Sequence, residues 1–358
     1  MKYATSRRLA LIATVLTFFV IILGAYTRLA DAGLGCPDWP GCYGHLTVPK
    51  SQEVIDTTNS LFQERELEKG KAWLEMVHRY FAGALGLMIA AIAIVAWGQR
   101  RKNKHPVKLP TFLLFLVTFQ AALGMWTVTL KLNPAIVMLH LMGGFATFAF
   151  LFLLSLRLSK AGQPFRIKKI TVEDLKPWAI VGLVLLVIQI ALGGWTSANY
   201  ASQICNGVAS LPICQGEWYR VLDFKEALTF WGLEMPERGN FEFGHFSPEV
   251  RTTIHVMHRI GAIIVTGYLV WFGWRLRNAQ NQLLEDLGTL MLLLLTVQVL
   301  LGLGNVLLGL PLLVATGHNA VAALLLLSLV AINFVLRIHK KPVHRKPQYK
   351  RRKRNYAK

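Results

Sequence analysis

Residues 73–97 read WLEMVHRYFAGALGLMIAAIAIVAW, a run in which the charged residues and the single histidine lie near the start and the rest is apolar. A helix rises about 1.5 Å per residue, so roughly 20 such residues cross the hydrocarbon layer of a bilayer. Lipid offers no partner for an unpaired backbone amide, which leaves a helix as the reasonable conformation. We therefore expect a transmembrane helix here.

Seven further runs have the same character, and the chain of 358 residues is 54% hydrophobic and only 16% charged. That composition is too apolar for a soluble domain of this length, and no run shows the alternation of a barrel strand. The sequence predicts an all-α integral membrane protein with eight transmembrane helices. The eight runs are 9–29, 73–97, 109–130, 134–156, 177–196, 252–274, 284–308 and 311–336.

The basic residues predict the orientation. Of 39 Lys and Arg, 27 lie in the N-terminal tail, after the second, fourth and sixth runs, and in the C-terminal tail, whereas the opposite loops hold only 9. By the positive-inside rule both termini are cytoplasmic. Residues 341–358 form a basic cytoplasmic tail, and we expect its last part, residues 350–358, to contact anionic lipid headgroups. No aromatic or motif context supports nucleic acid as a partner for the net charge of +20.

The N-terminal run is too long for a signal peptide and no small-residue cleavage site follows it, so we interpret it as a retained helix. The chain also has no Arg-rich, acid-poor transit peptide before this run. These features favour a bacterial inner membrane.

The chain repeats one plan. The motif LGAYT at 23–27 has a counterpart, LGGWT, at 192–196, and each half contains a His-Arg pair followed by a Gln that lies 20 residues before a second His. The two histidines of a half are separated by 62 residues in the first case and 60 in the second. The repeated residues are His78-Arg79, Gln120 and His140 in the first half, and His258-Arg259, Gln298 and His318 in the second.

This repeat predicts two pseudo-symmetric four-helix bundles, residues 1–160 and 170–340, joined by a basic link. Each half has an even number of helices, so both keep the same orientation and are related by an axis along the membrane normal. Each half also has one long outer loop, residues 30–72 and residues 197–251. Loops of this length are usually functional or disordered.

The four histidines are the strongest candidates for function, because polar groups inside a membrane are costly. All four are expected about 5 to 8 residues into helices that enter from the outer side, roughly 8–12 Å below the outer end. A haem iron takes one axial nitrogen from each side, and its flat ring fits between helices of a bundle. We therefore expect His78 with His140, and His258 with His318, to bind haem iron.

Neighbouring residues suit a haem as well. Arg79 and Arg259 directly follow a histidine, and with Arg28 they offer charged donors for haem propionates. Glycines near the histidines give the ring room beside the backbone. Two other interpretations stay open: a lone buried histidine is commonly a satisfied polar residue, and small residues commonly serve helix packing. A di-iron site would need several carboxylates beside the histidines, and Glu75 is the only one at such a position.

The halves differ three residues before the first histidine, where Glu75 in one half corresponds to His255 in the other. Residues at i and i+3 share a helix face, so each side chain is placed toward the haem of its half. Glu75 is either a first-turn acid that interacts with the helix dipole or a residue of the chemistry. His255 is expected to support the site or an interface.

All four cysteines lie in the outer loops, paired by loop as Cys36 with Cys42 and Cys205 with Cys214. Local disulfides are the favoured interpretation on the oxidising side of the membrane. A metal site made of Cys36, Cys42 and His45 is an alternative. No C-x-x-C-H motif exists, which excludes covalent c-type haem.

The Glu75-x-x-His78-Arg79 motif, the four ordered histidines and the segment GAYTRLADAGLGCPDWPGC at 24–42 together resemble the bacterial haem A synthase family. The resemblance covers the chain from its first helix to its last. It implies oxidation of the C8 methyl of haem O to the formyl group of haem A by two successive hydroxylations, for cytochrome oxidase biogenesis. It also implies that Glu75 is catalytic.

By the same resemblance His78 and His140 bracket the substrate haem O, and His258 and His318 hold a haem b cofactor that passes electrons. The partners implied are haem O synthase and cytochrome oxidase assembly factors, and a homo-oligomer is a further candidate assembly. The alternative from another class is a non-enzymatic b-type cytochrome or haem-handling subunit, which would use the same four histidines without needing Glu75.

Overall fold

The computed structural model describes residues 3–103, 106–159, 167 and 169–338. Eight helices in this part are long and apolar enough to cross a membrane, which confirms the predicted number, and the described residues contain no β-strand. The eight are α1 (Ala4–Leu29), α3 (Lys69–Gly98), α5 (Lys108–Thr129), α6 (Pro134–Leu158), α7 (Lys169–Ala198), α9 (Pro248–Arg277), α10 (Gln282–Leu307) and α11 (Leu312–Arg337).

The remaining helices are short. They are α2 (Gln52–Leu61), α4 (Arg100–Asn103) and α8 (Phe224–Ala227), with 3-10 turns η2 (Ala201–Gln203), η3 (Val208–Ser210) and η4 (Trp218–Arg220). The predicted link between the halves lies largely outside the described residues, and so does the basic tail, residues 341–358.

Local sequence explains where several long helices begin. The Asn133 side chain accepts from the amide of Ala135, with Pro134 at the first position of α6. The Ser247 side chain accepts from the amide of Val250, with Pro248 opening α9. Both arrangements satisfy an N–H group that has no partner within the helix.

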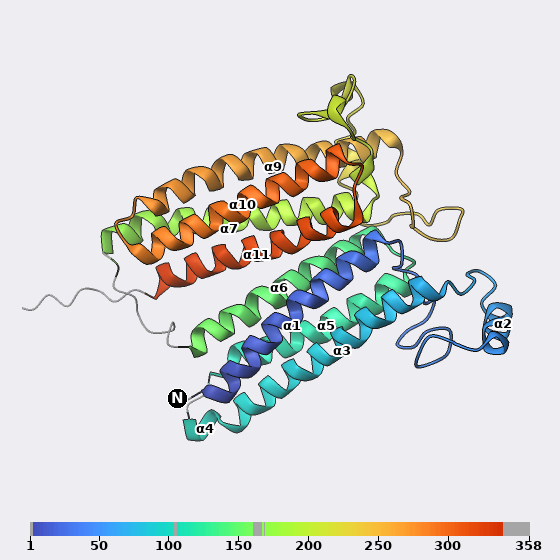
Figure 1. Ribbon diagram of the computed structural model, residues 1–358, viewed down its shortest axis with the longest axis horizontal. Helices are drawn as coiled ribbons and strands as arrows, with labels where there is room; N and C mark the ends of the chain where they lie inside the picture. Colours follow the sequence, from blue (N-terminus) through green and yellow to red (C-terminus); the bar gives the residue numbers. More distant parts are fainter. Residues whose placement is uncertain (1–2, 104–105, 160–166, 168, 339–358) are drawn as a thin grey trace, which may run out of the picture.

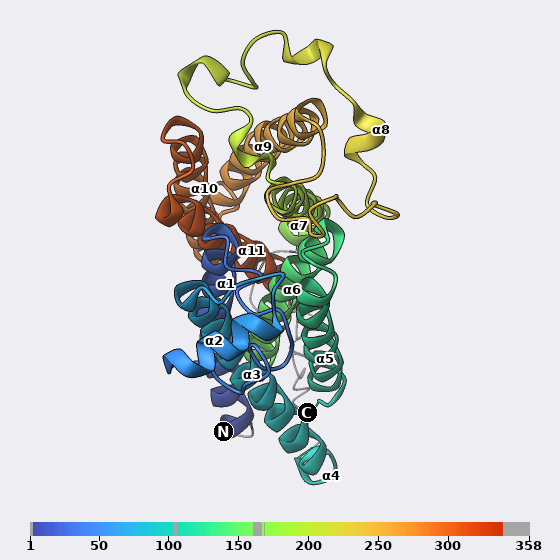
Figure 2. The ribbon, with the colours of Figure 1, turned by 90° about the vertical axis from the view of Figure 1, so that its right-hand side faces the viewer.

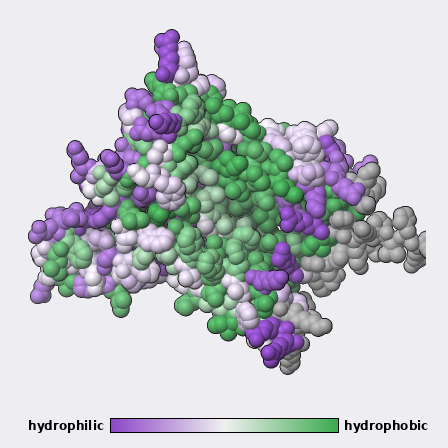
Figure 3. All heavy atoms as spheres, turned by 180° about the vertical axis from the view of Figure 1, so that it is seen from behind, coloured by the Kyte–Doolittle hydropathy of each residue, from purple (hydrophilic) through white to green (hydrophobic). Residues whose placement is uncertain are grey.

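The long helices pack in two groups of four. In Figure 1, α1, α3, α5 and α6 form one group and α7, α9, α10 and α11 the other. The groups meet where α6 and α1 pack against α7 and α11. Each group has its own apolar core, and α11 contributes many of the buried residues of the second. Figure 3 shows an apolar band across the molecule between more polar ends, as a bilayer requires.

The two long loops lie together at one end of the helices, opposite the start of α1 (Figures 1 and 2). They are shorter than predicted, residues 30–68 and 199–247, because α3 and α9 each begin four residues before their apolar runs. Half of those eight residues are charged, so hydropathy alone does not place them in a transmembrane helix.

Contacts across this end join the halves. The Arg28 guanidinium donates to the carbonyl oxygen of Ser197 at 2.7 Å and lies 3.9 Å from the ring centre of Tyr200. Arg65 forms an ion pair of 2.9 Å with Glu242, a buried residue of the second loop. Asp31 is itself partly buried beside Arg28, and this burial raises the pKa of its carboxyl, while the Arg28 charge opposes the rise. The two loops therefore pack together as one layer at this end of the helices.

His245 in the second loop predicts a pH dependence. Its ring lies 3.9 Å from that of Phe246, and burial, helped by the Arg238 charge, lowers its pKa to about 4. An unfolded loop would protonate this histidine near its ordinary pKa of about 6.5. The unfolded state then binds more protons between about pH 6.5 and 4, so stability falls as the pH falls through that window.

We expect backbone amides of residues 199–247 to exchange faster with solvent at pH 5 than at pH 7.5, after correction for the intrinsic exchange rate. His245→Phe keeps the aromatic packing and removes the titration, so its protection should be nearly independent of pH over this range. Equal pH dependence in the two proteins would contradict this assignment.

Candidate functional site

His78 on α3 and His140 on α6 face each other across the first group of helices. Their ring centres are 6.5 Å apart and the rings are nearly perpendicular, at 88°. Two imidazoles that share one metal ion stand roughly 6 Å apart, because each metal–nitrogen bond is about 2.0 Å long. The observed separation therefore suits a single ion between the rings.

His258 on α9 and His318 on α11 occupy the corresponding positions in the second group of helices. His140 and His318 each follow the first residue of their helix by 6 positions. His78 and His258 follow theirs by 9 and 10, farther than predicted, because α3 and α9 begin earlier than their apolar runs. Among the described residues, no three His, Cys, Asp or Glu side chains gather into one metal-binding group.

Each histidine ring lies against a glycine of another helix. A Cβ atom built on that glycine would come within 3.0–3.2 Å of the ring, closer than ordinary van der Waals contact. A larger residue at any of the four positions would push the ring aside. The four contacts are Gly24–His78, Gly124–His140, Gly193–His258 and Gly302–His318.

These surroundings fit a haem in each group of helices. The imidazoles are paired, the helices around them are apolar, and buried polar atoms close by lack a partner within the described residues. Those atoms are Nδ1 of His140 and the side-chain oxygens of Gln120, Gln189 and Gln298. A bis-imidazole site uses this donor set without a carboxylate at the iron.

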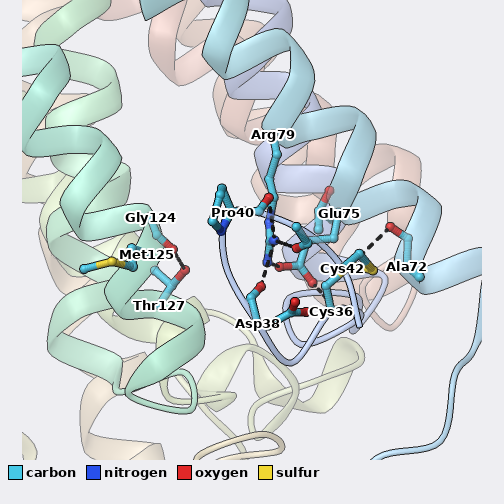
Figure 4. Close-up of polar contacts among 12 residues, drawn as sticks. Cys36, Asp38, Pro40, Cys42, Ala72, Glu75, Arg79, Gly124, Met125 and Thr127 are labelled. Atoms are coloured by element: carbon cyan, nitrogen blue, oxygen red, sulfur yellow. Dashed lines mark hydrogen bonds and ion pairs between the residues drawn. A yellow bond between two sulfur atoms is a disulfide. The ribbon is translucent and has the colours of Figure 1, made fainter. Parts of the chain in front are cut away.

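Glu75 lies one turn before His78 and binds the first outer loop (Figure 4). One carboxylate oxygen accepts from the backbone amide of Cys36 at 2.8 Å, and the other pairs with Arg79. Arg79 in turn donates to the carbonyl oxygens of Asp38 and Gly41. The carboxylate is buried, so the loop covers it and keeps it from bulk solvent.

The prediction that Glu75 could be a first-turn acid is wrong. Helix α3 begins at Lys69, so Glu75 is its seventh residue and the first turn contains no acid. The structure instead gives the carboxylate a structural role that the sequence did not indicate, that of fixing the loop of residues 30–68. Its predicted part in the chemistry stays a prediction.

His255 plays the corresponding part in the second half. Its Nδ1 donates to the carbonyl oxygen of Ala201 at 2.8 Å, and its Nε2 accepts from Arg259 at 3.1 Å. In each half, therefore, two residues of one helix hold a long loop in place. They are Glu75 and Arg79 in the first half, and His255 and Arg259 in the second. Only the first half does so with a carboxylate.

The arginines expected at haem propionates already contact protein acceptors. Arg259 directs every donor group to the second loop or to His255, including the carbonyl oxygens of Ser210 and Cys205 at 2.6 Å. A propionate contact by Arg259 would require one of these bonds to break. Arg28 has a buried Nε without a partner among the described residues, so it has a donor to offer.

The cysteines form the two local disulfides expected from their positions, Cys36–Cys42 and Cys205–Cys214. The alternative metal site of Cys36, Cys42 and His45 is wrong, because both thiols are consumed in the disulfide. His45 pairs with Cys42 through backbone hydrogen bonds instead.

Three residues of the site escaped the sequence prediction: Gly124, Gly302 and Gln189. A repeated signal could have found them, because Gln-x-x-Leu-Gly occurs at 120–124, 189–193 and 298–302. In each copy the glycine contacts a histidine ring and the glutamine hydrogen-bonds to that same histidine.

Comparison with known proteins agrees with this arrangement. The COX15-CtaA family, described as cytochrome oxidase assembly protein, matches residues 7–330. A Shewanella oneidensis protein named heme A synthase is 48% identical over 91% of this chain and 94% of its own length. Heme A synthases of Chelativorans sp. and Mesorhizobium japonicum are each 25% identical, over 89% and 88% of this chain and 88% and 86% of theirs.

The Glu75 contacts lead to a prediction about the first loop. Glu75→Ala leaves the Arg79 charge and the Cys36 amide buried without their acceptor, and removing one partner of a buried pair costs about 3–5 kcal/mol. We expect residues 30–68 to become sensitive to protease and fast in hydrogen exchange, with the second loop unaffected. His255→Ala is the matched control and should loosen residues 199–247 instead. Unchanged protection in Glu75→Ala would show that the carboxylate does not fix the loop.

Proposed function

The chain belongs to the COX15-CtaA family of cytochrome oxidase assembly proteins, and we propose that it is a haem A synthase of a bacterial inner membrane. The observation that carries the proposal is the His78–His140 pair, 6.5 Å between ring centres, with the buried carboxylate of Glu75 one turn away. This arrangement offers axial ligands for a haem and an acidic group beside it.

The proposed architecture has two pseudo-symmetric halves, residues 1–160 and 170–340, related by an axis along the membrane normal. Both termini and the tail of residues 341–358 are cytoplasmic, and the haem sites lie toward the outer side. The distribution of basic residues supports this orientation. The common location of the two long loops at one end of the helices is compatible with it.

In this proposal the first half binds haem O, the substrate, through His78 and His140, with Arg28 and Arg79 near its propionates. The second half holds haem b through His258 and His318, near Arg259, and the haem b supplies electron transfer. The C8 methyl of haem O is hydroxylated twice, and the hydrated aldehyde loses water to give the formyl group of haem A.

Glu75 is the proposed catalytic residue. Oxidation of a methyl carbon attached to the porphyrin develops positive charge at that carbon, and a fixed carboxylate in a region without bulk water stabilises such charge or accepts a proton. Arg79 and the Cys36 amide hold the carboxylate in place, so little reorganisation is needed. His255, which occupies the same position in the second half, offers no such negative charge.

The rival function is a non-enzymatic b-type cytochrome or haem-handling subunit. It would use the same four histidines, hold two chemically identical haems and tolerate the loss of Glu75.

The proposed partners of the enzyme are haem O synthase, cytochrome oxidase assembly factors and a second copy of this chain.

Conversion of haem O tests the function directly. The chain is expressed with a haem O synthase in cells that lack haem A, and the extracted haems are separated by chromatography. We expect haem A and a hydroxylated intermediate. Haem O alone, with a folded and haem-loaded protein, would contradict the enzyme proposal and favour the cytochrome.

Glu75→Gln tests whether the charge of the carboxylate is needed for the chemistry. Glu75→Gln keeps an acceptor for the Cys36 amide and removes the charge, so haem A formation should fall at least tenfold while haem b is retained. His255→Gln in the other half should keep most of the conversion, because its loop contact can be replaced by an amide. Full conversion by Glu75→Gln would remove this residue from the proposed chemistry.

The glycine contacts predict haem content. Gly193→Val places methyl groups where a Cβ already comes within 3.0 Å of His258, so the ring must move. We expect haem b bound per chain to drop about tenfold or more, measured by pyridine haemochrome spectra. Gly267→Val on α9 is the control, since a Cβ there meets nothing within 4 Å.

A further inference from the structure

The second long loop contains a disulfide-closed segment without a charged residue. Residues 205–214 read CNGVASLPIC, whereas residues 215–247 of the same loop contain nine charged residues. The side chain of Val208 in this segment is 76% exposed, and Leu211 and Pro212 are exposed as well. Apolar groups gathered on a surface commonly mark contact with another apolar phase. The segment is called the Cys205–Cys214 loop below.

The backbone of the Cys205–Cys214 loop has partners within the protein. Arg259 donates to the carbonyl oxygens of three of its residues, at 2.6–2.7 Å. The amide and the hydroxyl of Ser210 donate to the carbonyl oxygen of Gly207. Lipid offers no partner for backbone polar groups, so a segment that enters it needs partners of this kind. The three residues bound by Arg259 are Cys205, Ser210 and Ile213.

The Cys205–Cys214 loop is joined to the end of α10, close to an apolar turn. The amide of Gly207 donates to the carbonyl oxygen of Val306 at 2.9 Å, one residue before α10 ends. Residues 306–315, which lead from α10 into α11, are all apolar residues, glycine or proline. Turns in water usually carry polar residues, yet Leu308 and Leu313 here are 66% and 77% exposed. This turn is therefore suited to lipid.

The same apolar surface continues down α10. A helix has about 3.6 residues per turn, so four exposed residues of α10 lie on the face opposite to Gly302. Gly302 contacts the ring of His318, which means that the four face away from the histidines. In a transmembrane helix such a face contacts lipid. The four residues are Leu293, Val297, Leu300 and Leu307.

The position of the loop agrees with contact at the bilayer surface. Figure 2, which views this end of the helices, shows the second loop extending past α9 and α10, away from the first group of helices. In Figure 1 the same part of the chain projects sideways beside the end of α9. A segment placed there lies over the lipid that surrounds the helices.

We propose that the Cys205–Cys214 loop and residues 306–313 form a membrane anchor, whose apolar side chains enter the interface of the lipid leaflet at this end of the helices. Since the anchor has no charge, burial of apolar surface holds it in the leaflet, and the charge of the headgroups contributes nothing. The membrane then supports the same loop that Arg259 holds. This proposal does not depend on the reaction that the protein catalyses.

The main test replaces Val208, Leu313 or Leu61, one at a time, with the photo-reactive residue p-benzoylphenylalanine in the full chain. Each protein is irradiated in nanodiscs of phosphatidylethanolamine and phosphatidylglycerol, and lipid adducts are measured by mass spectrometry. We expect about tenfold more adduct at Val208 and Leu313 than at Leu61. Leu61 is the matched control, because it is 75% exposed but lies on α2, beyond the end of the helices in Figure 1.

The same measurement can overturn the proposal. An adduct yield at Val208 no higher than at Leu61 would do so, and so would a crosslink of Val208 to a second copy of the chain in place of lipid. Nanodiscs of phosphatidylcholine alone should give an equal yield at Val208. A yield that requires the anionic lipid would contradict an anchor held by its apolar side chains.

A pair of variants tests the anchor without relying on one labelled position. With the photo-reactive residue at Leu211, Val208→Asp should lower the lipid adduct severalfold, because a carboxylate is costly in the apolar part of a bilayer. Val208→Leu should keep the adduct at the level given by the native valine. Equal yields in the two variants would overturn the proposal.

Discussion

The contact between an imidazole ring and a glycine on another helix sets the geometry of both proposed haem sites. Lipid gives helices no hydrophobic reason to associate, so close packing over small residues replaces it. Two adjacent glycines of α7 allow close packing against two different helices. Gly193 lies against His258 of α9, and a Cβ on Gly194 would lie 3.3–3.4 Å from Leu141 and Met138 of α6. Leu141 directly follows His140. The Gly193-Gly194 segment of α7 therefore contacts a histidine of the second half and also packs against the helix that carries His140 of the first half.

The outer loops depend on these helices in turn. Each loop is fixed by an arginine one residue after a histidine, so the loop is tied to the helix that carries a proposed haem ligand. In the second half the arrangement is neutral at His255 and uses every donor of Arg259. In the first half it uses the Glu75 carboxylate, which leaves an ionisable group buried beside the histidine pair. In the second half these contacts only hold the loop in place. In the first half they also place the negative charge of Glu75 where the proposed chemistry would need it.

Much of this architecture could be predicted from the sequence because its signals are local. Apolar runs give the helices, and the pairing of cysteines by loop gives Cys36–Cys42. The starts of α3 and α9 could not, because charged residues interrupt the apolar pattern there, at Lys69 and Lys71 and at Glu249 and Arg251. The Arg65–Glu242 pair joins residues 177 positions apart, and no local pattern indicates it. Gln189 could not be predicted from the histidine repeat, because it lies on a helix without a histidine, although its Gln-x-x-Leu-Gly motif recurs on three helices.

The differences between the halves are not spread evenly. The helix pairs α5–α6 and α10–α11 keep the same glutamine, glycine and histidine at matching positions, Gln120 with Gln298 among them. The pairs α1–α3 and α7–α9 differ at two positions that both bear on the first histidine, since Glu75 replaces His255 and Val20 replaces Gln189. One change places a carboxylate beside His78, and the other leaves an apolar side chain where α7 has a glutamine that hydrogen-bonds to the main chain of His258. Both differences therefore lie on the helix pair that carries Glu75 and His78, the pair for which chemistry is proposed.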